Sequence, residues 1–445
     1  MAKKQFKAES KRLLDLMINS IYTHKEIFLR EIVSNASDAI DKLCYLSLTD
    51  DKVGLNRSDY HIDIIVDKNE RTITVRDNGI GMTQEEAENN LGVIAKSGSY
   101  KFKSELDSEQ AEGEDISIIG QFGVGFYSAF MVADKVTVIT RKYGEEQGVM
   151  WESTGADGYT ITEAEKDTVG TDVIMHIKED ETGEKYSTYL ENWKLMMLIR
   201  KYSDYVRWPI VMDVEQSDWV DTGEKDEKGE PKMEMVTKTE EQTINSMVPI
   251  WQRSRKEATD EECIAFYKDK FHDKDDPLAV IRVNAEGLIS YRALLFIPAK
   301  APMNMFTRES DPGLELYSSG VMIMDKCTDL LPPCYAFARG VVDSPDLSLN
   351  ISREMLQHDR QLKLIAANLG KKIKSELTKL MTNDREKYEQ FHAAFGMMLR
   401  AGAVTETGDK VDEIKDLLLY HTSETKLVSL KEYVDSMPAE QTKIY

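Results

Sequence analysis

Apolar and polar positions follow two different periods along the chain. The two-residue alternation of half-buried strands occurs in four runs, at residues 62–66, 73–76, 136–140 and 172–177. Residues 29–39 instead carry apolar side chains at helical spacing, and helical patterns dominate after residue 353, as at residues 362–369. The sequence therefore predicts strands interleaved with helices in its first half and mainly helices near its end.

The predicted helix at residues 29–39 carries a stripe of polar side chains. Glu31, Asn35 and Asp38 are four and three residues apart, so at about 100° per residue they fall within roughly 60° of one another. The apolar face beside this stripe is formed by Ile32, Val33, Ala36, Ala39, Ile40 and Leu43. A polar stripe is usually a solvated face. Because this stripe borders the apolar face, the helix can also present it to a cavity.

A first glycine-rich turn follows the predicted strand at residues 73–76. It reads Asp77-Asn78-Gly79-Ile80-Gly81-Met82-Thr83, with Asp77 at the strand end. Loops at strand ends carry function more often than core positions do. Gly79 and Gly81 permit backbone conformations closed to other residues and allow a flat ligand to approach closely. The alternative is an ordinary Asn-Gly turn.

A second glycine-rich turn reads Gly120-Gln121-Phe122-Gly123-Val124-Gly125-Phe126. It lacks the Gly-Lys-Ser/Thr ending of a Walker loop, and its spacing differs from the Gly-x-Gly-x-x-Gly dinucleotide fingerprint. Residues 126–131 can begin a helix, whose free N–H groups and dipole would face an anion. The alternative is a structural glycine hinge. Together, an acid, an amide and two loops that a phosphate can approach are the parts of a nucleotide site.

The composition fits a large cytosolic protein. A chain of 445 residues is long enough for two or three domains. The formal net charge of −22 disfavours nucleic acids and anionic membranes as partners. No stretch approaches a membrane span, and the first residues lack the apolar core of a signal peptide. Four cysteines without a Cys-x-x-Cys pair favour reduced thiols: Cys44, Cys263, Cys327 and Cys334.

Shifts in composition divide the chain. Residues 1–214 form a first predicted domain, and residues 242–445 a second. Between them, residues 215–241 hold ten acids and four lysines with little apolar periodicity, which is typical of a solvated linker or a long hairpin. Residues 105–115 carry six acids and no basic residue, so composition alone favours a surface loop there.

In order along the chain, these motifs resemble the ATP site of the heat-shock-90 chaperones in their bacterial form. The segments that carry the resemblance are Glu31, Asn35, Asp38, residues 77–83, 90–98, 120–126 and 170–171, then residues 266–268, 291–298 and 347–357. The resemblance covers nearly the whole chain. Gyrase, histidine kinases and the mismatch-repair protein MutL share only the first of these elements.

The resemblance implies an α/β fold in two parts. The first would be a GHKL-type (Bergerat) ATP-binding α/β sandwich, a largely antiparallel sheet with helices on one face and nucleotide on the helical side. The second would be an α/β middle domain. Residues 95–125 would form a lid over bound ATP. The family also has a C-terminal dimerisation domain, so we expect this chain, which ends at Tyr445, to be a fragment of a protein that forms a homodimer through that absent domain.

Residue roles at the adenine end follow from the same motifs. Asp77 should accept a hydrogen bond from the adenine amino group, which favours adenine over guanine. Gly81 and Thr171 should help to close the adenine pocket, and Met82 is also expected to bind ATP. Asn90 and Lys96 should contact ribose or phosphate.

At the phosphate end, the backbone of the second turn should cradle the phosphates. The residues concerned are Gly120, Gln121, Phe122, Gly123, Val124, Gly125 and Phe126. Asn35 should supply an oxygen to Mg²⁺, which keeps several waters and takes few protein ligands. Asp38 is expected to support the pocket, with a simple surface or helix-packing role as the alternative.

Glu31 is the predicted general base for attack of water on the γ-phosphate, a role that typically contributes ~10²–10⁴-fold to the rate. Arg353 would supply stabilising charge from the second domain, and Gln357, one helical turn later, can face the same target. An ordinary surface ion pair is the alternative for Arg353. An arginine from another domain would make hydrolysis depend on domain closure.

The resemblance therefore implies a cytoplasmic bacterial chaperone of the stress response that hydrolyses ATP and closes around unfolded or partly folded client proteins. Two other hypotheses remain: a nucleotide-gated holdase or scaffold with negligible turnover, and a DNA-processing relative of gyrase or MutL, which the acidic charge disfavours. Client contacts are less visible. Met303, Met305 and Phe306 form either an exposed apolar loop or part of a core.

Overall fold

The computed structural model describes residues 22–94, 96, 98–99, 119–120, 123–225, 231–302, 312–347, 360–405, 411, 414–424 and 426–444. Within these ranges only the backbone is described for residues 216–225, 231–234, 236 and 405. The chain divides into two compact units, with the main boundary between Val248 and Pro249.

The described part of the first unit is built on an eight-stranded sheet. In spatial order its strands are β5 (Tyr159–Ala164), β4 (Gly148–Ser153), β3 (Ala133–Arg141), β6 (Gly170–Ile177), β2 (Thr72–Asp77), β1 (Ile62–Asp67), β7 (Ile210–Lys225) and β8 (Pro231–Thr243). All neighbours are antiparallel except β1 and β7. The four strands predicted from alternation are confirmed, each extended by one to four residues.

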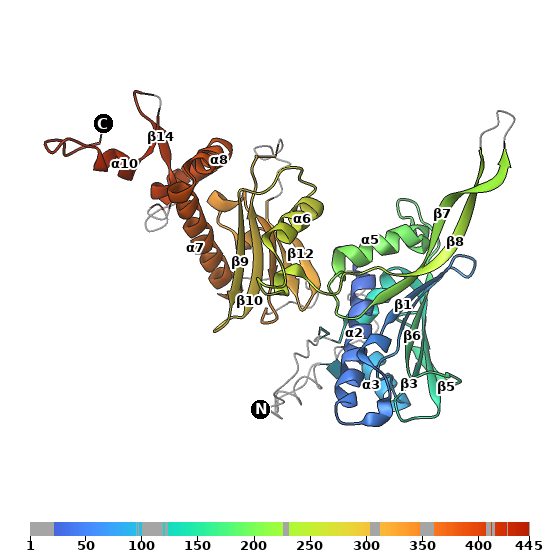
Figure 1. Ribbon diagram of the computed structural model, residues 1–445. Coiled ribbons are helices and arrows are strands. Elements are labelled where there is room, and N and C mark those ends of the chain that lie inside the picture. The colour runs from blue at the N-terminus through green and yellow to red at the C-terminus, as the bar shows by residue number, and fades with distance from the viewer. Residues whose placement is uncertain are drawn as a thin grey trace, which may run out of the picture. The chain divides into compact units, whose positions relative to one another are not determined.

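Helices cover one face of this sheet (Figure 1). They are α2 (Ile27–Ser47), α3 (Gln84–Leu91) and α5 (Asn192–Tyr202). The central helix α2 packs against β1, β2 and β6, and α5 packs against α2. Helix α2 includes the predicted helix at residues 29–39, which is thereby confirmed. It buries polar as well as apolar residues, among them Glu31 and Asp38 of the polar stripe, whereas Asn35 of the same stripe is exposed.

The face of the sheet toward the helices is apolar along most of its length. One cross-strand row runs Val138, Val173, Val75, Ile64 and Met212. The next row runs Val136, Met175, Ile73 and Val66. Paired residues of antiparallel strands point to the same face, so these rows form a continuous apolar floor beneath α2.

The described part of the second unit contains a five-stranded sheet. Its spatial order is β12 (Val321–Cys327), β11 (Leu314–Ser318), β13 (Arg339–Asp343), β10 (Tyr291–Ile297) and β9 (Ala279–Ala285). The helices are α6 (Asp260–Phe271), α7 (Arg360–Asn383), α8 (Arg385–Thr405) and α10 (Leu430–Asp435), and a small hairpin joins β14 (Leu419–His421) to β15 (Leu427–Ser429).

The core of the second unit lies between its sheet and the pair α7 and α8. Helix α7 presents one buried stripe at helical spacing, formed by Leu362, Ile365, Leu369, Ile373 and Leu377. Buried aromatic rings from α8 and the loop before β13 interlock, as Phe337 with Phe391 and Phe395. The mainly helical end of the chain that the sequence predicts is confirmed.

The acidic segment between the two predicted domains belongs largely to strands β7 and β8, which include its residues 215–225 and 231–241. All four cysteines are described and none forms a disulfide, as the sequence predicts. No helix in the described ranges is both long and apolar enough to cross a membrane. Met303, Met305 and Phe306 lie outside the described residues, as do most residues of the predicted lid.

Candidate nucleotide-binding site

A cavity of about 650 Å³ opens between α2, α3 and one end of the sheet, within the size range of small-molecule sites. Its walls include nearly all the described residues predicted for the site: Glu31, Asn35, Asp77, Gly81, Met82, Asn90, Lys96, Gly120, Gly123, Val124, Gly125, Phe126 and Thr171. Asp38 lies behind the wall. Gln121, Phe122, Arg353 and Gln357 lie outside the described residues.

The cavity meets the sheet where the apolar floor gives way to a polar row. Register pairing places Thr140 beside Thr171 and Thr171 beside Asp77, with their side chains on the helical face. Apolar residues close the row at both ends, with Val149 next to Thr140 and Ile62 next to Asp77. Three polar side chains in an otherwise apolar floor mark the place where a ligand can be recognised.

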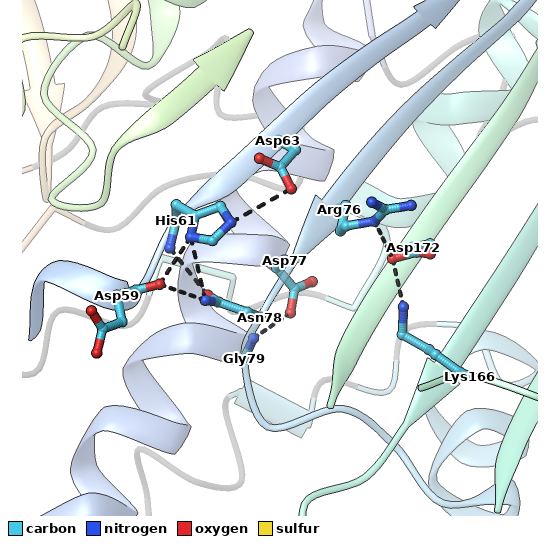
Figure 2. A network of polar contacts seen from close by, with 9 residues as sticks. All are labelled: Asp59, His61, Asp63, Arg76, Asp77, Asn78, Gly79, Lys166 and Asp172. Carbon is cyan, nitrogen blue, oxygen red and sulfur yellow. Dashed lines mark hydrogen bonds and ion pairs between the residues drawn. The ribbon is translucent and has the colours of Figure 1, made fainter. Parts of the chain in front are cut away.

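Asp77 is a buried acceptor at the end of β2. Its side chain is only 5% exposed, and its Oδ1 accepts a 2.9 Å hydrogen bond from the backbone N–H of Gly79 (Figure 2). The pKa of Asp77 is raised to about 7, chiefly by burial and also by nearby Asp172, whereas the Gly79 and Thr171 N–H groups and Lys166 oppose the rise. Ionisation of this buried carboxyl group therefore costs free energy, and a hydrogen-bond donor on a ligand would reduce that cost.

The turn that carries Asp77 is tied to its surroundings by backbone contacts. The Asn78 side chain accepts from His61 N–H at 3.1 Å and donates to the Asp59 carbonyl at 2.7 Å (Figure 2). Ile80 N–H donates to the Ala39 carbonyl of α2 at 3.0 Å. A Cβ at Gly79 would lie 2.4 Å from the Ala39 carbonyl carbon, so only glycine allows this contact between turn and helix.

The opposite face of the sheet carries a row of charges behind Asp77. Asp63, Arg76 and Asp172 are cross-strand neighbours. Asp172 Oδ1 accepts from Arg76 Nε at 3.1 Å and from Lys166 Nζ at 2.7 Å (Figure 2). Lys166 is almost fully buried. This cluster supplies the Asp172 and Lys166 charges that act on the pKa of Asp77 through the sheet.

Glu31 faces the second glycine turn. One of its carboxylate oxygens accepts hydrogen bonds from Arg30, and the other is directed at the turn. Arg30, 1% exposed, donates from Nε and Nη2 to Glu31 Oε1 at 3.0 and 2.8 Å. The other oxygen, Oε2, lies where a Cβ at Gly125 would be only 2.5 Å away. The guanidinium fixes the carboxylate while Oε2 stays directed at the glycine turn.

Asp38 joins α2 to the start of the second turn. Its Oδ1 and Oδ2 accept from Ile119 N–H and Gly120 N–H, each at 2.8 Å. The pKa of this buried carboxyl is raised, chiefly by burial, with Lys42 and the two N–H donors opposing. The structure therefore places Asp38 as a tie for the turn rather than in the wall of the cavity.

Asn35 presents its amide to the open part of the cavity. It is the exposed member of the polar stripe, and its Oδ1 would lie 3.3 Å from a Cβ added at Gly120. An amide oxygen is a hard ligand that suits Mg²⁺, which usually takes one or two protein ligands beside phosphate and water. Among the described residues no cluster of three or more His, Cys, Asp or Glu could hold a metal ion.

Lys42 is a cavity residue that our sequence analysis missed. Its Nζ donates to Ser99 Oγ at 2.9 Å, and both residues line the cavity. Burial, aided by Lys142, lowers its pKa, while Asp38, Glu86 and Asp77 oppose the shift. A signal was present: Lys42 continues the stripe of Glu31, Asn35 and Asp38 at heptad spacing. Arg30 and Thr140 gave no such signal.

The second turn approaches the cavity through its glycines. Gly123 has φ +64°, and a Cβ there would lie 2.4 Å from the Lys96 carbonyl carbon. Gly125 begins a short 3₁₀ helix (Gly125–Met131), which is the helix that the sequence predicts over residues 126–131. The first N–H groups of a helix have no partner within it, and Gly125 and Phe126 both line the cavity.

Comparison with known proteins matches two families to successive parts of the chain. A family described as "Histidine kinase-, DNA gyrase B-, and HSP90-like ATPase" matches residues 22–182, and a family described as "Hsp90 protein" matches residues 188–445. The match of the second half favours the chaperone hypothesis over the gyrase and MutL hypothesis.

Individual relatives match over the full chain. "Chaperone protein HtpG" of Bacillus subtilis (strain 168) is 55% identical over 447 residues, which cover 100% of this chain and 69% of the relative. The protein of the same name from Alkaliphilus metalliredigens (strain QYMF) is 54% identical over 446 residues, again with 100% and 69% covered. That from Clostridium perfringens (strain 13 / Type A) is 53% identical, with 100% and 70% covered.

Proposed function

The chain belongs to the HSP90 family and is an ATP-dependent molecular chaperone, and on this premise we propose how its cavity binds and hydrolyses ATP. One observation carries the proposal. A single cavity has a buried acceptor, Asp77, in its floor and a glycine turn facing the Glu31 carboxylate in its wall. The first group suits a purine amine, and the second suits a phosphate chain.

At the floor of the cavity, Asp77 accepts from the adenine amino group, and Gly81, Met82 and Thr171 surround the ring. This assignment is supported by the burial of Asp77 and by the hydrogen bond that its carboxylate accepts within the turn. A buried acceptor discriminates strongly between ligands, because an analogue without the matching donor leaves it unpaired.

The phosphates lie along the second turn, beside Lys42, Lys96 and Asn90. The basic side chains and the N–H groups at the start of the 3₁₀ helix suit this charge. Gln121 and Phe122 are assigned to the same cradle by their place in the motif. Asn35 supplies an oxygen to Mg²⁺, which neutralises phosphate charge when bound.

Glu31 is the general base for hydrolysis. Its Oε2 faces Gly125, whereas Arg30 holds Oε1, so the free oxygen is positioned to accept a proton from water near the phosphate chain. Arg353 supplies charge to the transferred phosphoryl group and Gln357 assists it. Hydrolysis then depends on closure of the second unit, which couples ATP turnover to shape.

The wider cycle follows from this coupling. We propose that the lid and domains close around unfolded or partly folded client proteins in the bacterial cytoplasm, and that the protein acts as a homodimer. Neither nucleic acid nor membrane is proposed as a partner, because the chain carries a net charge of −22.

Two variants test the assignment of the cavity. Asp77→Asn should abolish ATP binding detectable by calorimetry with Mg²⁺, since it removes the acceptor and sets an amide N–H₂ against the purine amine. Glu31→Gln should bind ATP like the parent and lose ~10²–10⁴-fold in turnover. Glutamine keeps an oxygen for Arg30, so the buried guanidinium is not left unpaired. Normal hydrolysis by Glu31→Gln would refute the base assignment, and binding of ATP by Asp77→Asn at parental affinity would refute the adenine site.

A further inference from the structure

Behind the cavity wall, one buried hydroxyl joins three segments of the first unit. Thr140 is 0% exposed and is not part of the cavity lining. Its Oγ1 accepts a 2.9 Å hydrogen bond from Met82 N–H and lies 3.0 Å from Thr171 Oγ1 and 3.3 Å from the Gly170 carbonyl oxygen. It therefore connects the first glycine turn to β3 and β6.

The donor of each hydrogen bond in this cluster can be assigned by counting protons. Met82 N–H can only donate, so it occupies one lone pair of Thr140 Oγ1. The single proton of Thr140 has two possible acceptors. The 3.0 Å distance to Thr171 Oγ1 is within the normal range for O–H···O, whereas 3.3 Å to the Gly170 carbonyl oxygen is beyond it. A hydroxyl that already accepts a hydrogen bond is also a better donor.

This assignment determines whether the Thr171 hydroxyl acts as a hydrogen-bond donor or as an acceptor toward the ligand. If Thr140 donates to Thr171 Oγ1, the Thr171 proton points elsewhere, and Thr171 becomes a donor beside the Asp77 acceptor. Both residues line the cavity and are paired across β2 and β6. The sheet thus presents an acceptor and a donor side by side to the ligand.

An acceptor beside a donor matches one edge of one kind of purine. A 6-aminopurine offers an amine donor next to an unprotonated ring nitrogen, N1. A 6-oxopurine offers the reverse, an oxygen acceptor next to an N–H donor. We propose that Thr140 is a positioning residue for purine selectivity, which holds the Thr171 hydroxyl as a donor toward N1 of the ligand, directly or through one water. This inference rests on the assignment of Asp77 to the adenine amine.

The test compares ATP with 1-deaza-ATP, in which a C–H replaces N1 and every other group is kept. The parent should bind ATP about tenfold more tightly, because one hydrogen bond to N1 is lost in the analogue. Thr140→Val, which has nearly the same shape, should lower this preference by more than twofold. Thr140→Ser, which keeps the hydroxyl, should restore it.

Thr137→Val is the matched control, since Thr137 lies on the opposite face of the same strand and donates to Glu152 Oε2. It should leave the preference unchanged. If Thr140 had only a structural role, Thr140→Val would bind ATP and 1-deaza-ATP more weakly by the same factor. A preference in Thr140→Val within twofold of the parental value, or a larger one, overturns the inference, as does a parent without any preference. If the parent fails to bind ATP at all, the proposed function itself fails.

Discussion

The two glycine turns of the cavity are attached to the protein in different ways. The first turn, which carries Asp77, is hydrogen-bonded on several sides: Asn78 to the residues before β1, Ile80 to the backbone of α2 and to Tyr143 N–H, and Met82 to Thr140. The second turn is joined to α2 through the two N–H groups that donate to Asp38.

The difference corresponds to the two ends of the ligand. A purine ring is rigid and is recognised by fixed groups, which the first turn provides as part of the sheet. A phosphate chain changes charge and length during hydrolysis, so its cradle has to rearrange. Within its described residues, the second turn is tied to the carboxylate of Asp38, on the same helix as Glu31, and a tie of this kind suits the need. The following changes probe the comparison, from the largest expected effect to the smallest.

Gly81→Ala should destabilise the whole first unit. Gly81 has φ +68°, and a Cβ would lie 2.0 Å from the Arg141 carbonyl oxygen at the end of β3. Left-handed strain and overpacking should together lower the free energy of unfolding by about 2–5 kcal/mol, measured by urea denaturation. Gly144→Ala is the control, because Gly144 has φ +86° but no atom near the added Cβ. Equal losses in both variants would show that strain, and not the close packing of the first turn, is responsible.

Gly123→Ala should act on binding more than on folding. Its added Cβ would meet the backbone of Lys96, outside the sheet and α2, at a glycine with φ +64°. We expect ATP affinity to fall about 30-fold, equivalent to about 2 kcal/mol, from strain in the phosphate cradle. The free energy of unfolding should change by less than about 1 kcal/mol. A loss of stability as large as that of Gly81→Ala would remove the distinction between the turns.

Asp38→Asn should loosen the second turn alone. Asparagine keeps one acceptor and turns an N–H₂ toward the other N–H group, so one charged hydrogen bond is lost, and ATP affinity measured by calorimetry should fall about 5- to 30-fold. Asp41→Asn is the control, because Asp41 is also buried on α2 but accepts from Trp208 Nε1 at 3.1 Å. If both variants bind ATP equally, Asp38 has no special part in holding the turn.

The first turn should make ATP affinity depend on pH. With the pKa of Asp77 raised to about 7 by burial, lowering the pH from 8 to 6 removes most of the carboxylate and should weaken binding about tenfold. Folding responds in the opposite direction. The stability contributed by this raised pKa is fully present below 3.8 and is lost as the pH rises through about 7.

Lys166→Met distinguishes titration of the Asp77 carboxyl group from titration of the ATP phosphates as the cause of the pH dependence. Lys166 lowers the pKa of Asp77, so its removal should move the midpoint of the affinity profile to higher pH, whereas a phosphate titration would stay in place. A profile with the same midpoint in both proteins would show that Asp77 does not control it.

The sequence alone located much of this site. Helical spacing placed Glu31, Asn35 and Asp38 on one stripe, and alternation located the strand that ends at Asp77. These features depend on neighbours along the chain, so period and composition reveal them. The same stripe contains Lys42, four residues beyond Asp38 and seven beyond Asn35, so the heptad spacing also indicates this residue.

Tertiary structure determined which role each residue of a given helix or strand has. On one helical stripe, Glu31 and Asn35 line the cavity while Asp38 ties a turn whose residues lie more than eighty positions later in the chain. Strand register alone brings Thr140, Thr171 and Asp77 into one row. The sequence determined which elements form and which faces they bury, because those depend on local periodicity. Only packing determined which buried polar groups meet, because every such group takes its partner from whatever the fold brings near it.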